Sequence, residues 1–524
     1  MLDHFPFYLG LIIAILLLMM LANKIKVAYP ILLVLAGLLI SFIPGIPAMH
    51  IDPELIFIIF LPPLLYDAAW AISWKELWHW RRIISSFAFI VVFLSAMSVA
   101  FVANRFIPGF SLALGFLLGG IVSPPDAVSA GAILKFVKVP KRMASILEGE
   151  SLLNDASSLI IFRFALIAIA TGQFAWHEAV LSFIWMVVGG LGIGLVIGWI
   201  FMKAHKILPT DANTDILFTI VTPYLMYTIA EEVHSSGVLA VVSGGLFLSN
   251  KRHLFLSSTS RLRGINVWES LSFILNGLVF MLIGLDLQEI TAGLGDVSIS
   301  SAIGYGVLIT AVLVVGRMLS TYGAVFVTLI ARNVITVADT RHPGYRVPFV
   351  MGWTGMRGVV SLAAALSIPV QLSDGSAFPQ RNLILFITFI VILLTLLVQG
   401  LTLPYLIRKI NLPNLDHDLQ EEELDVRIRK QLAEHALAHL RNHYSEELAK
   451  QPMLQQIARK WENHGQLVDD ASMEEEYKSI YLHLIDQQRQ WLLDKNRTEQ
   501  QLDEKTIRKH LLLLDLEEEK LRFG

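Results

Sequence analysis

The residues of this sequence that could do chemistry are concentrated in one apolar stretch, LEGESLLNDASSLIIFRFA, at positions 147–165. Ser151 and Asp155 are four residues apart, so a helix would place both side chains on one face, with Asn154 beside them. A hydroxyl, an amide and a carboxylate all present oxygen atoms, which small hard cations prefer as ligands. This face is therefore predicted to bind a cation at Asp155.

The location of the Asp155 carboxylate in an apolar run also favours a functional role for it. The flanking residues are those of a membrane span, and a carboxylate at the centre of a bilayer costs about 2.5–3.5 kcal/mol on insertion scales. Such a group is seldom retained without a role. The alternative is a structural, hydrogen-bonded aspartate, and the oxygen-rich face around Asp155 favours the functional interpretation.

Other ionisable residues also fall within apolar runs. Four acids and three bases leave one net negative charge, and they are Asp67, Asp126, Glu150, Asp155, Arg163, Arg317 and Arg357. Buried charges must be paired or neutralised. One proton or one monovalent cation would neutralise the surplus. The simplest scheme is exchange, in which H⁺ and Na⁺ (or another alkali ion) compete for Asp155 and the empty, charged site does not cross the membrane.

The other members of this set receive separate predictions. Glu150 lies five residues before Asp155 and is rotated by about 140° from it on a helix, so we predict a structural ion pair with Arg357. Asp126 follows two prolines at a predicted helix break, which favours a functional role. Asp67 either lines the site or hydrogen-bonds near the membrane boundary, and the sequence leaves both open. Cations cannot coordinate a cation, so structural roles are predicted for Arg163 and Arg317.

The elements that must position these residues are membrane helices. Hydrophobic residues make up 55% of the 524 positions, charged residues 16%, and the mean hydropathy is +0.60, whereas soluble domains are about a quarter charged. Charges are sparse up to about position 410 and dense from 414 onward. We predict a transmembrane domain over residues 1–411 and a cytoplasmic helical domain over 412–524. The absence of cysteine excludes disulfides and cysteine-ligated metals.

Thirteen apolar runs are long enough, at about 20 residues each, to cross a bilayer. They lie near 6–23, 28–45, 54–73, 83–104, 111–134, 148–171, 178–202, 214–231, 235–250, 266–286, 297–330, 348–370 and 382–407. With the N-terminus outside, the inner loops carry 18 Lys and Arg residues and the outer loops carry 2. This alternation follows the positive-inside rule. We therefore predict an all-α, multi-pass protein of the plasma (inner) membrane with a cytoplasmic C-terminus.

Two of these runs are predicted to be discontinuous helices. The fifth contains GGIVSPPDAVSAGA, and the twelfth contains GWTGMRGVVS. Proline and glycine interruptions in apolar spans free backbone groups that can face ions. The two runs are seven spans apart, so they cross the membrane in opposite directions, as in an inverted repeat. Kinks in packed helices are the commoner cause of such residues, but the matched placement favours a transporter.

The C-terminal region has two helix-forming runs in which apolar residues recur at helical spacing, near 419–444 and 473–496. A small cytoplasmic helical domain is predicted, with regulatory or dimer contacts as one possibility and a solvated appendage as the other. His435, His439 and His443 are spaced by four and could line one face. No cysteines or carboxylates complete a ligand pattern, so a metal site is not predicted.

At these residues the chain resembles the monovalent cation/proton antiporters of the NhaP and NHE type. GESLLNDA at 149–156 is similar to that family's sixth-helix signature, SPPDAVSAGA at 123–132 to its fifth-helix motif, and GMRGVVSLA at 355–363 to its twelfth. Three further segments match in order: FLPPLLYDA at 60–68, SGVLAVVSGGL at 236–246 and NGLVFMLIGLDL at 276–287. The resemblance covers roughly residues 6–410.

The resemblance implies roles for individual residues. Asp155 would carry cation and proton alternately, and Asn154 would be the neutral partner found in the electroneutral branch. A Na⁺ shell would consist of Asp155, Ser151 and Asp126, with the Pro125 carbonyl as a further ligand. The resemblance also implies that Glu150 and Arg357 pair, and that the protein is a homodimer in which a core domain moves against a dimerisation domain.

Two departures from the family pattern bear on ion selectivity. Many members have Thr-Asp-Pro where this chain has Pro125, Asp126 and Ala127, so a hydroxyl ligand is lost. Asp67 stands where a glutamate is common, and its shorter side chain makes direct ion contact doubtful. The choice between Na⁺, Li⁺ and K⁺ is therefore left open.

The predicted activity is electroneutral, one-for-one Na⁺/H⁺ exchange by alternating access. The alternatives are K⁺/H⁺ exchange, a cation channel, or a membrane sensor that signals through the C-terminal region. The sequence has no nucleophile, nucleotide-binding loop or ligand cluster, so an enzyme, a cofactor and a nucleic-acid partner are not predicted. The predicted partners are the lipid bilayer, a second copy of the chain, and regulatory contacts of the C-terminal region.

Overall fold

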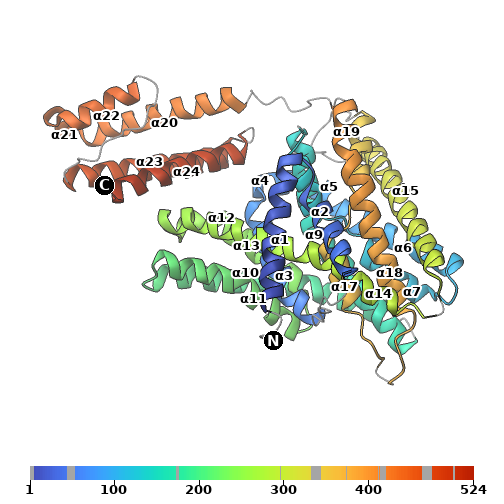
Figure 1. Ribbon diagram of the computed structural model, residues 1–524. Helices are drawn as coiled ribbons and strands as arrows, with labels where there is room; N and C mark the ends of the chain where they lie inside the picture. The colour runs from blue at the N-terminus through green and yellow to red at the C-terminus, as the bar shows by residue number, and fades with distance from the viewer. Residues whose placement is uncertain are drawn as a thin grey trace. The chain divides into compact units, whose positions relative to one another are not determined.

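The structure is a computed structural model in which every regular element of the described residues is a helix apart from one isolated bridge (Figure 1). It describes residues 5–43, 53–137, 139–172, 176–295, 297–331, 344–372, 375–410, 412, 421–462, 475–499 and 502–523. The described chain forms two compact units. The first contains 1–208, 217–251 and 268–415, and the second contains 209–216, 252–267 and 416–524. The predicted domain boundary at 411/412 adjoins residues outside the described part and stays a prediction.

The helices that precede the C-terminal region overlap the thirteen predicted apolar runs, except for the short α4 and α14, which lie outside them. They are α1 (Phe5–Ile25), α2 (Tyr29–Ser41), α3 (Pro53–Ala71), α4 (Trp74–His79), α5 (Arg81–Ser85), η2 (Ser86–Val91), α6 (Val92–Phe106), α7 (Leu112–Val122), α8 (Ala127–Leu134), α9 (Lys141–Thr171), α10 (Trp176–Ile207), α11 (Ala212–Glu232), α12 (Gly237–Lys251), α13 (Ser258–Leu285), α14 (Leu287–Ala292), α15 (Ile299–Ala331), α16 (Arg346–Trp353), α17 (Val359–Leu366), α18 (Arg381–Leu394), η4 (Thr395–Gln399) and α19 (Gly400–Ile410).

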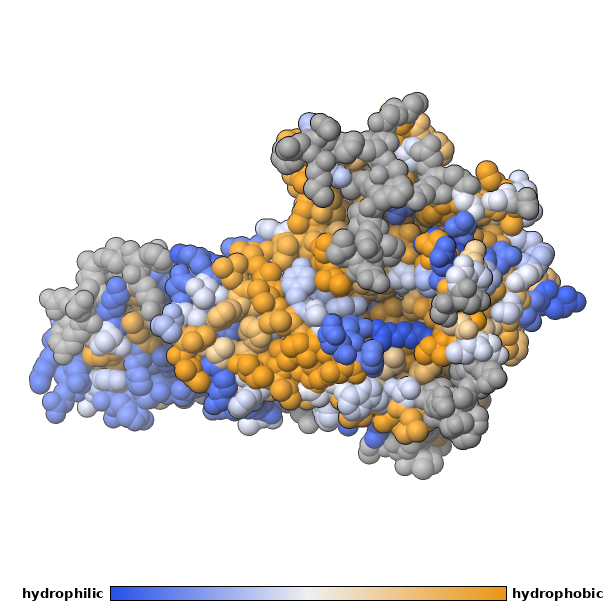
Figure 2. Space-filling model, turned by 90° about the horizontal axis from the view of Figure 1, so that it is seen from below, coloured by the Kyte–Doolittle hydropathy of each residue, from blue (hydrophilic) through white to orange (hydrophobic). Residues whose placement is uncertain are grey.

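Length and apolar composition identify membrane-spanning segments among these helices. Seven in the described part are long and apolar enough to cross a membrane by themselves, and three shorter apolar helices accompany them. The predicted discontinuous spans consist of the pairs α7–α8 and α16–α17. Figure 2 shows a broad apolar surface. Helix α10 of the first unit has exposed apolar side chains such as Leu181, Val188 and Trp199. Lipid can cover such a surface.

Within the first unit the helices pack as two groups. One group is centred on α7, which packs along α6 and α9, and it extends through α15 to α16 and α18. In the other group α12 packs along both α10 and α3. The α10–α12 contact depends on small residues, because a Cβ at Gly190 or Gly194 would overlap backbone oxygens of residues 236 and 240. Gly190 and Gly194 therefore serve the packing of α10 against α12.

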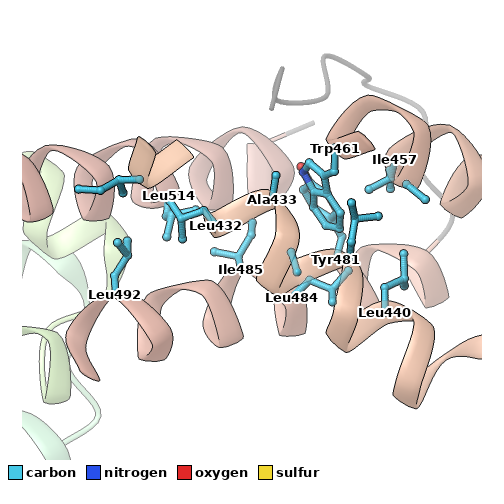
Figure 3. Packing of buried hydrophobic residues seen from close by; sticks show 14 of the residues in the cluster. Leu432, Ala433, Leu440, Ile457, Trp461, Tyr481, Leu484, Ile485, Leu492 and Leu514 are labelled. Atoms are coloured by element: carbon cyan, nitrogen blue, oxygen red, sulfur yellow. The ribbon is translucent and has the colours of Figure 1, made fainter. Parts of the chain in front are cut away.

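The second unit has its own apolar core, formed by the helices of the C-terminal region (Figure 3). These are α20 (Glu421–His443), α21 (Ser445–Lys450), α22 (Pro452–Glu462), α23 (Glu475–Thr498) and α24 (Glu504–Phe523). Trp461 and Tyr481 stack at the centre of this core, with ring centroids 6.3 Å apart, beside the fully buried Leu484. The two runs with apolar residues at helical spacing coincide with α20 and α23.

Buried ion pairs join α24 to the other segments of the second unit. The guanidinium of Arg261, in the first turn of α13, donates two hydrogen bonds to the carboxylate of Asp515. Arg489 of α23 donates to the same carboxylate at 3.0 Å and to Glu518 at 2.8 Å. Asp515 is only 2% exposed. The C-terminal helices are thus bonded to residues 252–267, a contact that apolar periodicity does not predict.

Candidate cation site at the crossing of two broken helices

The first break separates α7 from α8 at the sequence SPPD. Proline has no backbone N–H and disfavours a helical conformation in the residue before it, so the paired prolines end α7. Asp126 then caps α8, because its carboxylate accepts the backbone N–H groups of Val128 (3.0 Å) and Ser129 (3.1 Å). The Ser129 hydroxyl donates to the same carboxylate. Asp126 therefore fixes the N-terminus of a half-helix.

The second break separates α16 from α17 and lies directly against the first. The backbone N–H of Asp126 donates to the carbonyl of Met356 at 2.7 Å. The Arg357 guanidinium donates to the carbonyls of Val122 (2.8 Å) and Ser123 (3.2 Å), at the C-terminal end of α7. A cation stabilises the negative end of a helix dipole, so Arg357 compensates the end that the break exposes.

A glycine permits this crossing. A Cβ at Gly358 would overlap the carboxylate of Asp126, so no other residue fits there while the two breaks remain in contact. Thr395, in the π-helical turn η4, accepts the backbone N–H of Arg357 at 3.1 Å. Thr395 was not among the predicted residues, because a π-helical turn leaves no signature in the sequence. Such turns are frequent at functional sites.

Helix α9 brings the predicted binding face to the crossing. The Asn154 amide is fully buried, and its Nδ2 donates to the Pro125 carbonyl at 2.9 Å. This bond leaves the amide oxygen of Asn154 without a partner among the described residues. Asp155 is 7% exposed and near enough to Asp126 for the two carboxylates to repel each other. Ser151 lies one turn earlier on α9 and is partly buried.

The environment of Asp155 differs from that of Asp126. In the described part of the chain, no hydrogen bond to the Asp155 carboxylate is present, whereas three donors engage Asp126. A buried carboxylate without donors must be neutralised. Of the two acids at the crossing, Asp155 is the one whose oxygens are available to a proton or a cation.

The predicted ion pair between Glu150 and Arg357 is wrong. Glu150 pairs instead with Arg317 of α15, through two hydrogen bonds of 2.6 and 2.9 Å, and both side chains are almost fully buried. The orientation of Glu150 away from Asp155 agrees with the helical rotation, but that face of α9 meets α15. Arg357 is occupied by the carbonyls at the end of α7. The sequence indicates that each buried basic residue needs a partner. It does not indicate which helices lie next to each other.

Two further residues complete the placement of the predicted set. Asp67 of α3 accepts a hydrogen bond from Ser272 of α13 at 2.7 Å, and no contact between Asp67 and Asp155 is present among the described residues. Arg163 of α9 forms an ion pair with Glu231, in the last turn of α11. Glu231 was left out of the predicted set, although its position at the end of an apolar run was a usable signal.

Two half-helices that meet end to end at a buried carboxylate, inside an apolar helical bundle, define a class of secondary transporter. A sequence profile of the family described as "Sodium/hydrogen exchanger, transmembrane" matches residues 11–409. The chain therefore belongs to this family.

Similar proteins agree with this assignment. A "Sodium, potassium, lithium and rubidium/H(+) antiporter" of Bacillus subtilis is 35% identical over 390 residues, which cover 72% of this chain and 57% of that protein. The counterpart from Bacillus pumilus is 33% identical, and the match spans 58% of its length. The chain thus spans a little over half of these two relatives.

A relative from Aphanothece halophytica, the "Na(+)/H(+) antiporter ApNhaP", is 35% identical over 420 residues, which cover 79% of this chain and 75% of that protein. The solved structure of the sodium proton antiporter MjNhaP1 from Methanocaldococcus jannaschii superposes with a TM-score of 0.61 at 20% identity. That match covers 75% of this chain and 98% of the other. It establishes a shared fold.

Proposed function

We propose that the protein exchanges Na⁺ for H⁺ across the membrane, with Asp155 as the group for which the two ions compete. The observation that supports this most strongly is the difference between the two carboxylates at the crossing. Asp126 is occupied as a helix cap, whereas Asp155 is buried and lacks a donor among the described residues. A proton or a monovalent cation would satisfy it.

The cation shell would be built mainly on α9. Asp155 would supply charge, Ser151 a hydroxyl oxygen, and Asn154 its amide oxygen. The bond from Asn154 Nδ2 to the Pro125 carbonyl fixes which end of the amide is free, since only the nitrogen can donate. Asp126 contributes negative potential to this shell. Oδ2 of Asp126 already accepts two hydrogen bonds and Oδ1 accepts one, so only Oδ1 keeps a lone pair for direct coordination.

The charge at the crossing supports electroneutral exchange. The pairs Glu150–Arg317 and Arg163–Glu231 are each balanced. Asp67, which accepts a hydrogen bond from Ser272 of α13, is not one of the groups at the breaks and is left out of this count. Two carboxylates and one guanidinium remain at the breaks, which leaves one net negative charge: Asp126, Asp155 and Arg357. One Na⁺ or one H⁺ neutralises it. Alternating access then moves either neutral form, so one ion is exchanged for one proton without net charge transfer.

The distribution of basic loops and the contacts of the second unit support a cytoplasmic C-terminus. In that unit α24 is bonded to residues 258–261, which lie in an inner loop of the predicted topology. A C-terminal region on the inner side explains this contact. The homodimer implied by the family resemblance is carried forward as part of the proposal, and the exposed apolar side chains of α10 offer area for it.

The experiment that tests the proposal is fluorescence dequenching in proteoliposomes with an imposed pH gradient. Addition of Na⁺ should release luminal protons in the unmodified protein, while Asp155→Asn should abolish the response and Asp155→Glu should retain part of it. The same vesicles receive Li⁺ and K⁺, which separates Na⁺/H⁺ from K⁺/H⁺ exchange. Retained Na⁺ response in Asp155→Asn contradicts the assignment. Flux far above transporter turnover would indicate a channel.

A further inference from the structure

An ion pair outside the site joins the two helix groups of the membrane unit. Arg163 lies on α9, in the group centred on α7. Glu231 lies in the last turn of α11, which contacts α12 of the other group. The two side chains are 35% and 28% exposed, so the protein encloses the pair only partly. The buried pair Glu150–Arg317 is different, because both of its helices belong to the group that contains the site.

Glu231 is held within its own helix group. One carboxylate oxygen accepts the backbone N–H of Gly237, the first residue of α12, at 3.0 Å. Glycine is needed there because a Cβ would lie 2.7 Å from the ring of Tyr227 on α11. The Met226 side chain of α11 packs against Gly244 of α12. The orientation of Glu231 is therefore set by α11 and α12, and only its second oxygen reaches Arg163.

Arg163 is linked rigidly to the site. It follows Asp155 by eight residues on the same helix, which is about 12 Å along the axis. In the proposed topology α9 runs from the inner to the outer side, so the pair lies on the outer side of Asp155. The ion pair thus lies between Asp155 and the outer surface. There it links α9, the helix that carries the site, to the group of α10–α12.

We propose that Arg163 and Glu231 form an outer latch, which is closed when Asp155 faces the inside and opens when Asp155 faces the outside. This inference rests on the proposed exchange function, because alternating access requires α9 to move against the second group. A half-exposed pair of this kind shifts an equilibrium by about two- to five-fold, which is weak enough to break in every cycle. The fully buried Glu150–Arg317 pair would stay intact and travel with the site.

The absence of cysteine makes a direct test possible, because introduced thiols are the only ones present. In the variant Arg163→Cys/Glu231→Cys, a bis-methanethiosulfonate with a spacer of about 10 Å would join α9 to α11. The matched control is Trp185→Cys/Val233→Cys. Trp185 donates to the Val233 carbonyl at 3.1 Å, and both residues lie at the same outer end but within one helix group.

Cross-linking should lower Na⁺/H⁺ exchange in the latch variant at least ten-fold, and reduction should restore it. The control variant should keep its exchange when cross-linked. Na⁺/H⁺ exchange by the latch variant before cross-linking shows that the proposed transport function is present. A variant that never exchanges would argue against the proposed function, whereas exchange that survives cross-linking would argue against the latch alone. A cross-linked latch variant that still exchanges Na⁺ for H⁺ at its original rate would overturn the proposal.

Charge variants provide an independent measurement that does not require cross-linking. Arg163→Gln and Glu231→Gln should each lower the apparent KM for Na⁺ presented from outside by about two- to five-fold, because the outward-facing state becomes more populated. Glutamine at 231 can still accept the Gly237 N–H. The exchanged pair Arg163→Glu/Glu231→Arg re-forms an ion pair and should move the KM back toward the original value, while the Gly237 N–H loses its acceptor because arginine can only donate. An unchanged KM in both single variants would refute the latch.

Discussion

Removing the carboxylate of Glu150 should strongly destabilise the membrane unit. Glu150→Gln keeps the size of the side chain but leaves the guanidinium of Arg317 charged, buried and without its carboxylate. Both side chains are at most 3% exposed, and the pair is bidentate at 2.6 and 2.9 Å. Breaking a buried pair of this geometry costs about 3–5 kcal/mol. Folded proteins are stable by about 5–15 kcal/mol, so this loss is a large fraction of the total.

Thermal unfolding in detergent, followed by a thiol-independent probe such as intrinsic fluorescence, measures this effect. A double-mutant cycle identifies the partner. Glu150→Gln and Arg317→Gln should be strongly non-additive, with a coupling energy of about 1–3 kcal/mol, because each removes the same interaction. Glu150→Gln and Arg357→Gln should couple more weakly, because the Arg357 guanidinium donates its hydrogen bonds to carbonyls and not to Glu150. Coupling of Glu150 to Arg357 rather than to Arg317 would refute the geometry described above.

Three further predictions follow from the crossing and from the second unit. Gly358→Ala should abolish exchange by forcing the breaks apart, while Gly131→Ala, whose Cβ would meet nothing within 4 Å, should not; equal activities in dequenching would contradict this. Asp515→Asn leaves Arg261 without its buried partner and should increase limited proteolysis of α24; an unchanged cleavage rate would argue against the contact. Burial and the neighbouring guanidinium groups lower the pKa of His253 to about 2. A base with a lowered pKa in the folded state costs stability as the pH falls below about 6.5, so the Tm should drop between pH 7 and pH 5, and His253→Gln should reduce that slope.

The sequence predicts the membrane helices well because lipid imposes a strong compositional constraint. Each helix must satisfy its backbone internally and present apolar side chains to lipid, so runs of about 20 apolar residues identify spans. The two discontinuous helices were also predictable, since Pro124 and Pro125 in one run and clustered glycines in the other cannot continue a regular helix. The break at 354–358 and the cap at Asp126 follow from the same residues.

Pairing between helices was not predictable in the same way. The helical rotation of Glu150 away from Asp155 shows that it faces another helix, but not that this helix is α15. Arg357 was expected to pair with an acid, whereas the carbonyls at the end of α7 satisfy it. Backbone carbonyls carry no signal in a sequence, so a base that compensates a helix end cannot be distinguished from one that pairs with an acid.

The role of Glu231 was missed for a related reason. It lies at the end of an apolar run, where an acidic residue is commonly solvated, and its partner Arg163 is 68 residues away. The periodic apolar positions of α20–α24 predicted their helices, but the ion pairs with Arg261 depend on the tertiary fold. The local pattern of apolar residues thus predicts helices. Ion pairs between residues far apart in the sequence have to be observed in the structure.

Competition at one carboxylate is tested most directly by counting the protons released when Na⁺ binds. Isothermal titration of the purified protein with Na⁺, in buffers of different ionisation enthalpy and near the pH at which the site is protonated, gives that number. Cation binding to a carboxylate must displace its proton, so the account predicts release of close to one proton per Na⁺ bound and no such release in Asp155→Asn. Sodium binding without proton release, or release that persists in Asp155→Asn, would contradict it.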